Sequence, residues 1–242
     1  MTTNRLENKV ILVTGASRGI GRAVAIEAGK QGAEVILTGR TTGALEEVDD
    51  HIHAVGGKSV IVELDQTDLA AIPRLAAAIH SRWQRLDGFV ANAGQLGQLS
   101  PITHSEDDVF DRTIMVNLTS IFHMIKAFDS LLRASDAGRA VLVSSSAAIG
   151  HRPFWGAYAI SKAGMEAMAR SWASESEKTN MKINILDPGG TRTAMRAAAY
   201  PGENPEDVPA AEDIAPAFMD LLAEDCPYHG ERLLAREMLG LS

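Results

Sequence analysis

The chain has 242 residues, a length that favours one large α/β domain over two small ones. Hydrophobic residues make up 45% of the sequence, which allows a substantial core and excludes a disordered chain. The formal net charge of -8 and the lack of a basic stripe exclude nucleic acid as an expected partner, and no apolar run reaches membrane-spanning length.

Short apolar runs alternate with segments of helical spacing along the chain. In chain order we expect a strand at 9–14, a helix at 20–31, a strand at 34–38, a helix at 44–55, a strand at 59–64, a helix at 69–83 and a strand at 88–91. The second half continues with a helix at 106–132, a strand at 139–144, a helix at 158–178, a strand at 182–186, a helix at 214–223 and a last strand at 232–235. This alternation predicts parallel βαβ units, and hence an α/β fold with a doubly wound parallel sheet in one domain, 1–242.

One segment departs from this pattern. Residues 197–212 contain several prolines and a glycine amid acidic residues, and they show no periodic apolar face. Such a composition is typical of a surface loop. We expect the segment to be a mobile loop within the domain.

A glycine-rich turn follows the first expected strand, in the run from Thr14 to Gly21. Gly15, Gly19 and Gly21 allow a sharp turn and let backbone N–H groups approach a pyrophosphate, which the amino end of the next helix also favours. The spacing differs from the commoner Gly-x-Gly-x-x-Gly pattern, and a tight turn without a ligand is the alternative. The strand before it and the helix after it favour a dinucleotide site.

The end of the second expected strand indicates which dinucleotide binds. An acidic residue there would accept hydrogen bonds from the ribose of NAD, but this chain has Gly39 followed by Arg40. Arg18, in the glycine turn, can reach the same place. Two guanidinium groups favour the extra phosphate of NADP. Each arginine taken alone is also compatible with a solvated surface position.

Proton-transfer chemistry is indicated further along the chain. Tyr158 and Lys162 are four residues apart on an expected helix, so they share a face. A nearby ammonium favours a phenolate, and the expected attraction is large enough to lower the tyrosine pKa by units. Ser145, at the end of the fifth strand, can donate to a substrate oxygen. Helix packing, a solvated lysine and a serine turn within Ser144, Ser145 and Ser146 are the alternatives.

Together these motifs resemble the short-chain dehydrogenase/reductase family over nearly the whole chain. The resemblance implies a Rossmann-type sheet of seven strands. It implies catalytic roles for Asn117, Ser145, Tyr158 and Lys162. The cofactor residues that it implies, together with those expected from the chain itself, are Gly15, Ser17, Arg18, Gly19, Ile20, Gly21, Arg40, Asp65, Gln66, Asn92, Ala93, Gly94, Tyr158, Lys162, Pro188, Gly189, Thr191 and Thr193.

The implied reaction is hydride transfer between NADP(H), preferred over NAD(H), and a carbonyl or secondary alcohol. Tyr158 is the implied general acid in reduction and base in oxidation. The resemblance also places Asp65 at the adenine and Thr193 at the nicotinamide carboxamide, and has Asn117 hold a water that joins Lys162 to solvent. A 3-oxoacyl-thioester (acyl carrier protein) reductase is an alternative within the family. A catalytically silent, dinucleotide-sensing regulatory protein is the alternative from another class.

The region after the sixth strand resembles a bacterial subgroup of oxidoreductases without known substrates. Arg192 and Arg196 are unusual there, and they either meet an anionic substrate group or lie on the surface. Trp155 and His151 precede Tyr158 in a region that walls the substrate pocket of similar proteins. Because it follows Thr193 and forms no periodic apolar face, we expect the loop 194–212 to be a substrate lid, although it is short for this family. The carboxyl terminus departs from the family in lacking its glycine pair.

Two further expectations concern partners and compartment. The apolar helices at 106–132 and 158–178 predict a homodimer or homotetramer, which the resemblance also implies. Residues 1–9 are not typical of a signal peptide, and the single cysteine, Cys226, fits a reducing compartment. The seven histidines lack ligand spacing. We therefore expect a cytoplasmic protein that acts on a small molecule, with no membrane partner and no required metal.

Overall fold

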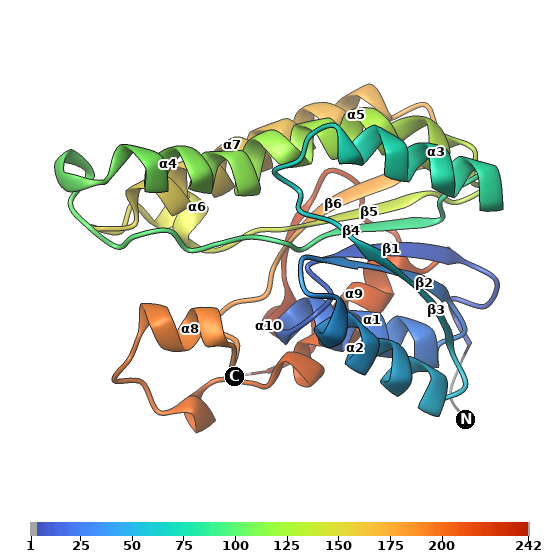
Figure 1. The fold of residues 1–242 in the computed structure, drawn as a ribbon, viewed down its shortest axis with the longest axis horizontal. Coiled ribbons are helices and arrows are strands. Elements are labelled where there is room, and N and C mark those ends of the chain that lie inside the picture. Colours follow the sequence, from blue (N-terminus) through green and yellow to red (C-terminus); the bar gives the residue numbers. More distant parts are fainter. Residues whose placement is uncertain (1–3, 242) are drawn as a thin grey trace.

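A seven-stranded sheet with helices on both faces organises the chain (Figure 1). The computed structural model describes residues 4–241. Every strand pair is parallel, in the order β3-β2-β1-β4-β5-β6-β7. The strands are β1 Val10–Thr14, β2 Glu34–Gly39, β3 Lys58–Glu63, β4 Gly88–Ala91, β5 Arg139–Val143, β6 Lys182–Asp187 and β7 Arg232–Leu234. This confirms the α/β, doubly wound, seven-stranded fold expected from the sequence.

Helices cover the sheet in two layers (Figure 1). One layer contains α1 Gly19–Lys30, α2 Thr42–Ala54, α9 Ala211–Leu222 and α10 Ala235–Met238. The other contains α3 Ala71–Trp83, α4 Asp107–Ile114, α5 Ser120–Arg133 and α7 Gly156–Glu175. The short α6 Ala147–Gly150 packs on α7, whereas α8 Ala194–Ala199 and the 3₁₀ turn Pro205–Asp207 project from the carboxyl ends of the strands.

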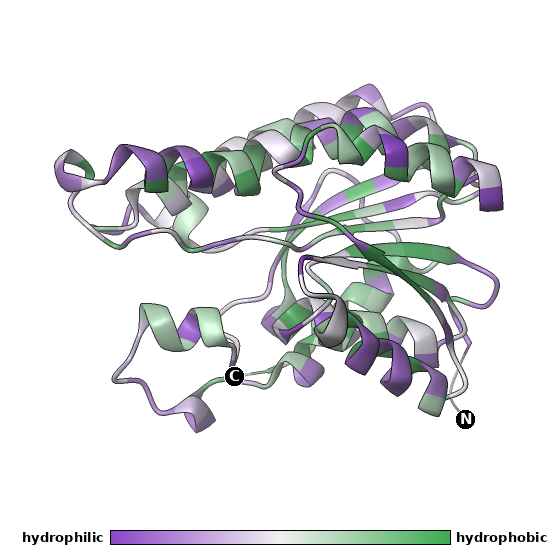
Figure 2. Cartoon of the chain, viewed as in Figure 1, coloured by the Kyte–Doolittle hydropathy of each residue, from purple (hydrophilic) through white to green (hydrophobic). Residues whose placement is uncertain are grey.

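Each face of the sheet builds its own hydrophobic core. Leu12 of β1 points into the layer of α3, α5 and α7, where Phe89 and Phe128 meet edge to face at 5.4 Å between ring centres. Its neighbour Val13 points to the opposite layer and packs in the same cluster as Phe218 of α9. Figure 2 shows the corresponding pattern, with apolar strands between helices whose outer sides are hydrophilic. Burial on both faces explains why the strands are continuous apolar runs.

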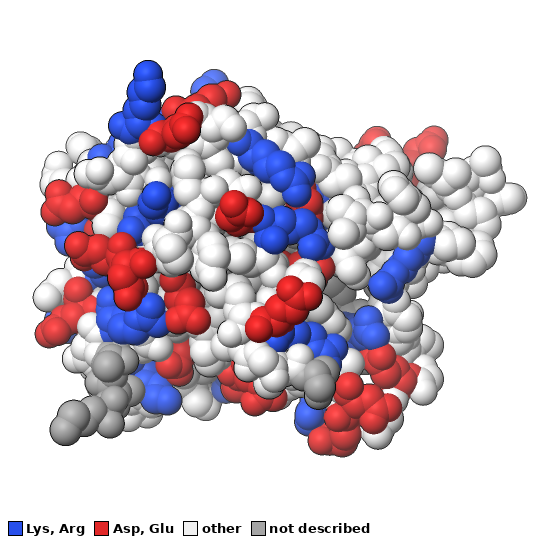
Figure 3. All heavy atoms as spheres, turned by 180° about the vertical axis from the view of Figure 1, so that it is seen from behind, with Lys and Arg blue, Asp and Glu red and all other residues white. Residues whose placement is uncertain are grey.

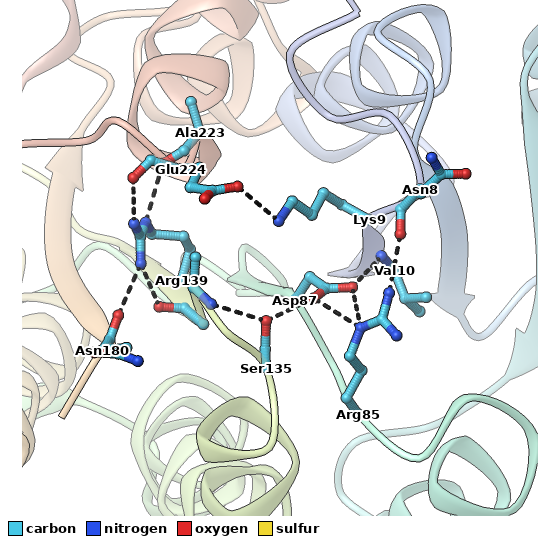
Figure 4. A network of polar contacts seen from close by, with 12 residues as sticks. Asn8, Lys9, Val10, Arg85, Asp87, Ser135, Arg139, Asn180, Ala223 and Glu224 are labelled. Atoms are coloured by element: carbon cyan, nitrogen blue, oxygen red, sulfur yellow. Dashed lines mark hydrogen bonds and ion pairs between the residues drawn. The ribbon is translucent and has the colours of Figure 1, made fainter.

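Buried polar contacts hold the amino ends of the strands together (Figure 4). Arg139 is only 4% exposed, and its guanidinium donates to the carbonyl oxygens of Ala223 (3.0 Å) and Glu224 (2.7 Å), just past the end of α9. Asp87 accepts from the backbone N–H of Val10 at 2.8 Å and from the hydroxyl of Ser135 at 2.6 Å. These contacts fix one end of the sheet and leave the opposite end for a ligand.

Three expectations need correction. The helix expected at 106–132 contains a π-helical turn at Met115–Thr119, between α4 and α5. The helix expected at 158–178 begins at Gly156 and ends at Glu175. The segment 197–212 is not an irregular loop, because it includes the second half of α8, a 3₁₀ turn and the start of α9. The hydroxyl of Thr193 caps α8 by accepting from the N–H of Arg196 at 3.1 Å, which explains the helix that the composition obscured.

Charged side chains of both signs are interspersed over the face shown in Figure 3, without a basic patch. This distribution gives no electrostatic footprint for nucleic acid on that face. No helix among residues 4–241 is long and apolar enough to cross a membrane. Within the same residues, no group of three or more His, Cys, Asp or Glu side chains is placed to hold a metal ion.

Candidate active site

A cavity of about 720 Å³ opens at the carboxyl ends of the strands. This is where open parallel sheets bind ligands. Most of the residues singled out in the sequence line it, namely Gly15, Ser17, Arg18, Gly19, Ile20, Arg40, Asp65, Gln66, Asn92, Ala93, Gly94, Ser145, Tyr158, Lys162, Pro188, Gly189, Thr191 and Thr193. Gly21 and Asn117 lie behind the lining. The structure therefore brings the glycine turn and the Tyr158 helix, far apart in sequence, to one site.

The glycine turn joins β1 to α1 at the floor of this cavity. Gly15 and Gly19 have φ of 64° and 54°, values that favour glycine. A Cβ on Gly21 would lie 2.3 Å from the carbonyl oxygen of Gly15 and 2.4 Å from the Asn92 amide nitrogen. The Asn92 amide in turn donates to the carbonyl of Thr14 at 2.9 Å. No side chain caps the amino end of α1, so its first N–H groups remain for a ligand.

Two arginines face the cavity beside this turn. Arg18 and Arg40 are exposed, and neither guanidinium forms an ion pair with any residue in the described chain. The nearby Asp65 carboxylate accepts from the N–H and hydroxyl of Thr67 at 2.9 and 2.8 Å. The backbone bond from Thr67 is the main reason that the pKa of Asp65 is lowered, and Arg40 adds to the effect. Unpaired cations beside a phosphate-type turn are suited to an anionic ligand.

The π-helical turn positions Asn117, which is 1% exposed. Its side chain accepts from the N–H of Gln95 and donates to the carbonyl of Gln95, both at 2.9 Å. It also donates to the hydroxyl of Ser161 at 3.0 Å. A Cβ on Gly94 would lie 3.2 Å from Asn117 Oδ1 and 3.7 Å from Lys162 Nζ. The missing side chain of Gly94 thus leaves room between the amide and the ammonium.

Tyr158 and Lys162 share the inner face of α7, as the sequence predicts, and are 8% and 4% exposed. Lys162 Nζ lies 5.8 Å from the Tyr158 ring centre. The expectation that the ammonium lowers the tyrosine pKa is wrong for this structure. Burial raises the pKa of Tyr158 to about 12, and an interaction with the Ser145 hydroxyl offsets this only in part. Desolvation disfavours the charged phenolate, and the nearby Asp187 carboxylate disfavours it further.

Burial acts on the lysine in the opposite sense. It lowers the pKa of Lys162 to about 8, against the attraction of Asp187 and Glu166. These two carboxylates belong to a buried network that sequence reasoning missed. Arg232 of β7 donates to Glu166 and to Asp187, each at 2.8 Å. Ser144 donates to Glu166 at 2.6 Å, which leaves Ser145 as the serine that interacts with Tyr158.

An aromatic wall continues from the phenol to the mouth of the cavity. The rings of Trp155 and Tyr158 meet edge to face at 5.8 Å, and Trp155 lies 5.9 Å from Tyr200. The sequence pointed to Trp155 but gave no reason to single out Tyr200. His151 is exposed and does not line the cavity.

Arg192 and Arg196 also line the cavity, but acidic residues of the following segment neutralise both. Arg196 makes two hydrogen bonds to Glu203, at 2.6 and 2.5 Å. These bonds raise the pKa of Arg196 and lower the pKa of Glu203. Arg192 pairs with Glu206 at 2.8 Å. Neither guanidinium is therefore poised for an anionic substrate group.

Comparisons with known proteins agree with this geometry. The family model for short chain dehydrogenases matches residues 9–204. An uncharacterised oxidoreductase of Escherichia coli (strain K12), YciK, is 39% identical over 223 residues, which are 91% of this chain and 88% of that protein. A short chain dehydrogenase of Escherichia coli CFT073, solved in complex with NADPH, has a TM-score of 0.92 and 37% identity, with 97% of this chain and 99% of that chain covered. Another, from Shigella flexneri 2a strain 301 and complexed with NADP, has a TM-score of 0.92 and 37% identity, with 97% and 100% covered.

Proposed function

The chain belongs to the short chain dehydrogenase family, and we propose that it uses NADPH to reduce a carbonyl compound, with Tyr158 as the proton donor. Membership makes it an oxidoreductase that uses a nicotinamide cofactor. The choice of NADP(H) over NAD(H), the direction and the residue roles are the proposal.

The lining of the cavity supports NADP(H) as the cofactor. Gly15 and Gly19 adopt the positive φ that the turn requires, Gly21 lets the turn pack against Asn92, and no side chain caps the start of α1. Arg18 and Arg40 supply unpaired cations for the additional phosphate. Relatives with NADP or NADPH bound support this choice. When bound, the cofactor supplies or accepts the hydride.

The further cofactor contacts are proposed from the cavity lining. Asp65 and Gln66 lie where the adenine end is expected, and Thr191 and Thr193 follow β6 on the opposite side. The Asp65 carboxylate keeps one oxygen free of the Thr67 bonds, because both use the same oxygen, Oδ1. That second oxygen can accept from an amino group of the base.

The place of Tyr158 on the cavity wall, beside Ser145 and Lys162, is the observation that carries its proposed role. A tyrosine phenol is protonated at neutral pH, and burial keeps it so, which allows it to donate a proton to a carbonyl oxygen. The Ser145 hydroxyl, at the same wall, donates a second hydrogen bond to that oxygen. Reduction needs both groups, whereas a protein that only senses the dinucleotide needs neither.

Lys162 and Asn117 are proposed to return a proton to Tyr158 after it has protonated the substrate. The ammonium lies within the same buried pocket as the phenol, and the space beside Gly94 connects it to the Asn117 amide. We expect a water in that space to link Lys162 with solvent. The reaction would then draw one proton per turnover along this path.

The protein is also proposed to be a cytoplasmic homo-oligomer. Phe122 of α5 and Ile160 of α7 are 51% and 43% exposed in the single chain, on the two helices expected at the interface. Exposed apolar side chains on adjacent helices are typical of a subunit contact.

The direct test follows NADPH oxidation by absorbance over a panel of ketones, aldehydes and 3-oxoacyl thioesters. We expect turnover with at least one ketone or aldehyde. Turnover confined to 3-oxoacyl thioesters would favour the alternative reductase. NADPH binding with no oxidation over the whole panel would contradict the proposed function and favour a sensing protein.

A further inference from the structure

We propose that the substrate is an uncharged ketone carrying a flat, apolar group, and that Trp155 and Tyr200 hold this group. The proposal rests on the proposed function, because it concerns the substrate end of the same cavity. It follows from two independent observations, the aromatic wall and the pairing of the nearby charges.

The wall begins at the proposed proton donor. Trp155 contacts Tyr158 edge to face at 5.8 Å, so its ring lies beside the position that a reacting carbonyl must occupy. The backbone that carries this ring is held in place, because the N–H of Ser100 donates to the carbonyl of Phe154 at 3.0 Å and Ser100 pairs with Trp155 in a β-bridge. A substituent next to the carbonyl therefore meets the Trp155 indole.

Tyr200 extends the wall from the other side of the cavity. Its hydroxyl accepts from Arg152 at 2.8 Å, and the Arg196 guanidinium lies 3.8 Å from its ring centre. The ring lies 5.9 Å from Trp155 at an interplanar angle of 39°. Tyr200 is thus held at both its edge and its face. Two positioned aromatic rings favour a flat apolar partner, which gains from ring contacts as well as from burial.

Apolar side chains, several of them small, form part of the same lining. Leu96, Met195, Ala198 and Ala199 face the cavity. The charged groups among them, Arg192 and Arg196, are already paired. This lining favours an apolar substituent over a highly hydroxylated one.

Charge pairing disfavours an anionic group as the main determinant of substrate binding. Arg196 is bound through two hydrogen bonds to Glu203, and Arg192 is paired with Glu206. Arg152 has no acidic partner in the described chain, but it does not line the cavity and donates instead to Tyr200 and Ser146. A substrate carboxylate would have to displace an existing ion pair and lie beside glutamates.

The test compares two ketones with one skeleton, methyl 4-acetylbenzoate and the 4-acetylbenzoate anion. With NADPH and the wild-type protein, we expect kcat/KM for the ester to exceed that for the anion by about tenfold or more. Butanone, which lacks the ring, should show a KM higher than that of the ester by a similar factor. Equal or better turnover of the anion, or of butanone, would overturn the proposal.

Two variants test the two observations separately. Tyr200→Ala should raise KM for the ester about tenfold, whereas Ile149→Ala, at an exposed position of α6 outside the cavity lining, should not. Glu203→Gln frees Arg196 and should lower the ester-to-anion preference several-fold. Glu224→Gln removes a glutamate that pairs with Lys9 at the opposite end of the sheet, and it should leave that preference unchanged. An unchanged preference in Glu203→Gln would overturn the charge argument.

The outcomes separate this proposal from the proposed function. Turnover of anionic or small ketones alone would retain the reductase and overturn the aromatic site. If no ketone is turned over, calorimetric titration of the NADPH-bound protein with methyl 4-acetylbenzoate decides. Binding that Tyr200→Ala weakens would support the aromatic site, and no binding would overturn it. The wild-type ester-to-anion ratio keeps the test valid even if Tyr200→Ala fails to fold.

Discussion

The ammonium of Lys162 donates to the backbone carbonyl of Val143 at 2.7 Å, while it lies 5.8 Å from the centre of the Tyr158 ring. The lysine is therefore tied to the end of β5, beside the phenol rather than bonded to it. Its ammonium is buried with two carboxylates nearby, and its charge depends on pH in a range that an assay can reach.

This arrangement predicts a loss of carbonyl reduction as pH rises through about 8, the value to which burial lowers the pKa of Lys162. The protonated lysine is the active form, so activity is present below this pH and declines above it. Tyr158 adds no step there, because its pKa is raised to about 12. The measurement is kcat/KM for reduction from pH 6 to 10. Lys162→Arg, which keeps its charge, should remove the step; a wild-type profile that is level through pH 8 would contradict the assignment.

Arg40→Ala should weaken NADPH binding by about tenfold or more and leave NADH binding nearly unchanged. A charge-assisted contact to the additional phosphate contributes about 1.5–3 kcal/mol. Fluorescence titration gives both dissociation constants. Arg74→Ala, an exposed arginine of α3 outside the cavity lining, is the matched control. Equal NADPH and NADH affinities in the wild type would rule out the predicted preference.

Local spacing was enough to predict the glycine turn, the Tyr158–Lys162 pair and the parallel sheet. Each of these features involves residues that are close in sequence, and the regular geometry of a strand or helix sets their relative positions. The apolar runs of β1 and β4, and the four-residue interval from Tyr158 to Lys162, carry this information directly. The fold and these two motifs were accordingly predictable, whereas Asp65, Asn92 and Thr193 of the cavity lining were expected only from the family resemblance.

Contacts between distant residues were not predictable in this way. Arg232 meets Glu166 across 66 positions of sequence, and Tyr200 meets Arg152 across 48. The predicted direction of the Tyr158 pKa shift was wrong for a related reason. Spacing predicts that Tyr158 lies near Lys162, but it does not predict the burial that is the main cause of the shift. Helix α8 could not be predicted from composition, because the Thr193 cap that begins it precedes a segment without a periodic apolar face.

The buried network around Glu166 should contribute strongly to stability. Glu166 is 2% exposed and accepts from Ser144 and Arg232. Glu166→Gln leaves Arg232 with one carboxylate partner, and we expect a loss of about 3 kcal/mol in the free energy of unfolding. Urea denaturation measures it. Glu175→Gln, exposed on the same helix, should change stability by no more than about 0.5 kcal/mol. Similar values for the two variants would argue against the network.

Light scattering at micromolar concentration should give two or four times the chain mass of 25.8 kDa. Phe122→Asp places a charge among the exposed apolar residues of α5 and should shift the protein toward the monomer. Val55→Asp, at an exposed apolar position after α2, is the control and should not. A wild-type mass equal to one chain would contradict the predicted oligomer.

The central claim, that Tyr158 gives its proton to a carbonyl oxygen, is tested most directly by single-turnover NADPH oxidation in Tyr158→Phe. The wild type should oxidise NADPH with a carbonyl compound from the panel. The variant should be slower by about 10²–10⁴-fold, the range for loss of a general acid, while its NADPH dissociation constant stays within about twofold. Near-normal NADPH oxidation by Tyr158→Phe with the same compound would contradict the account.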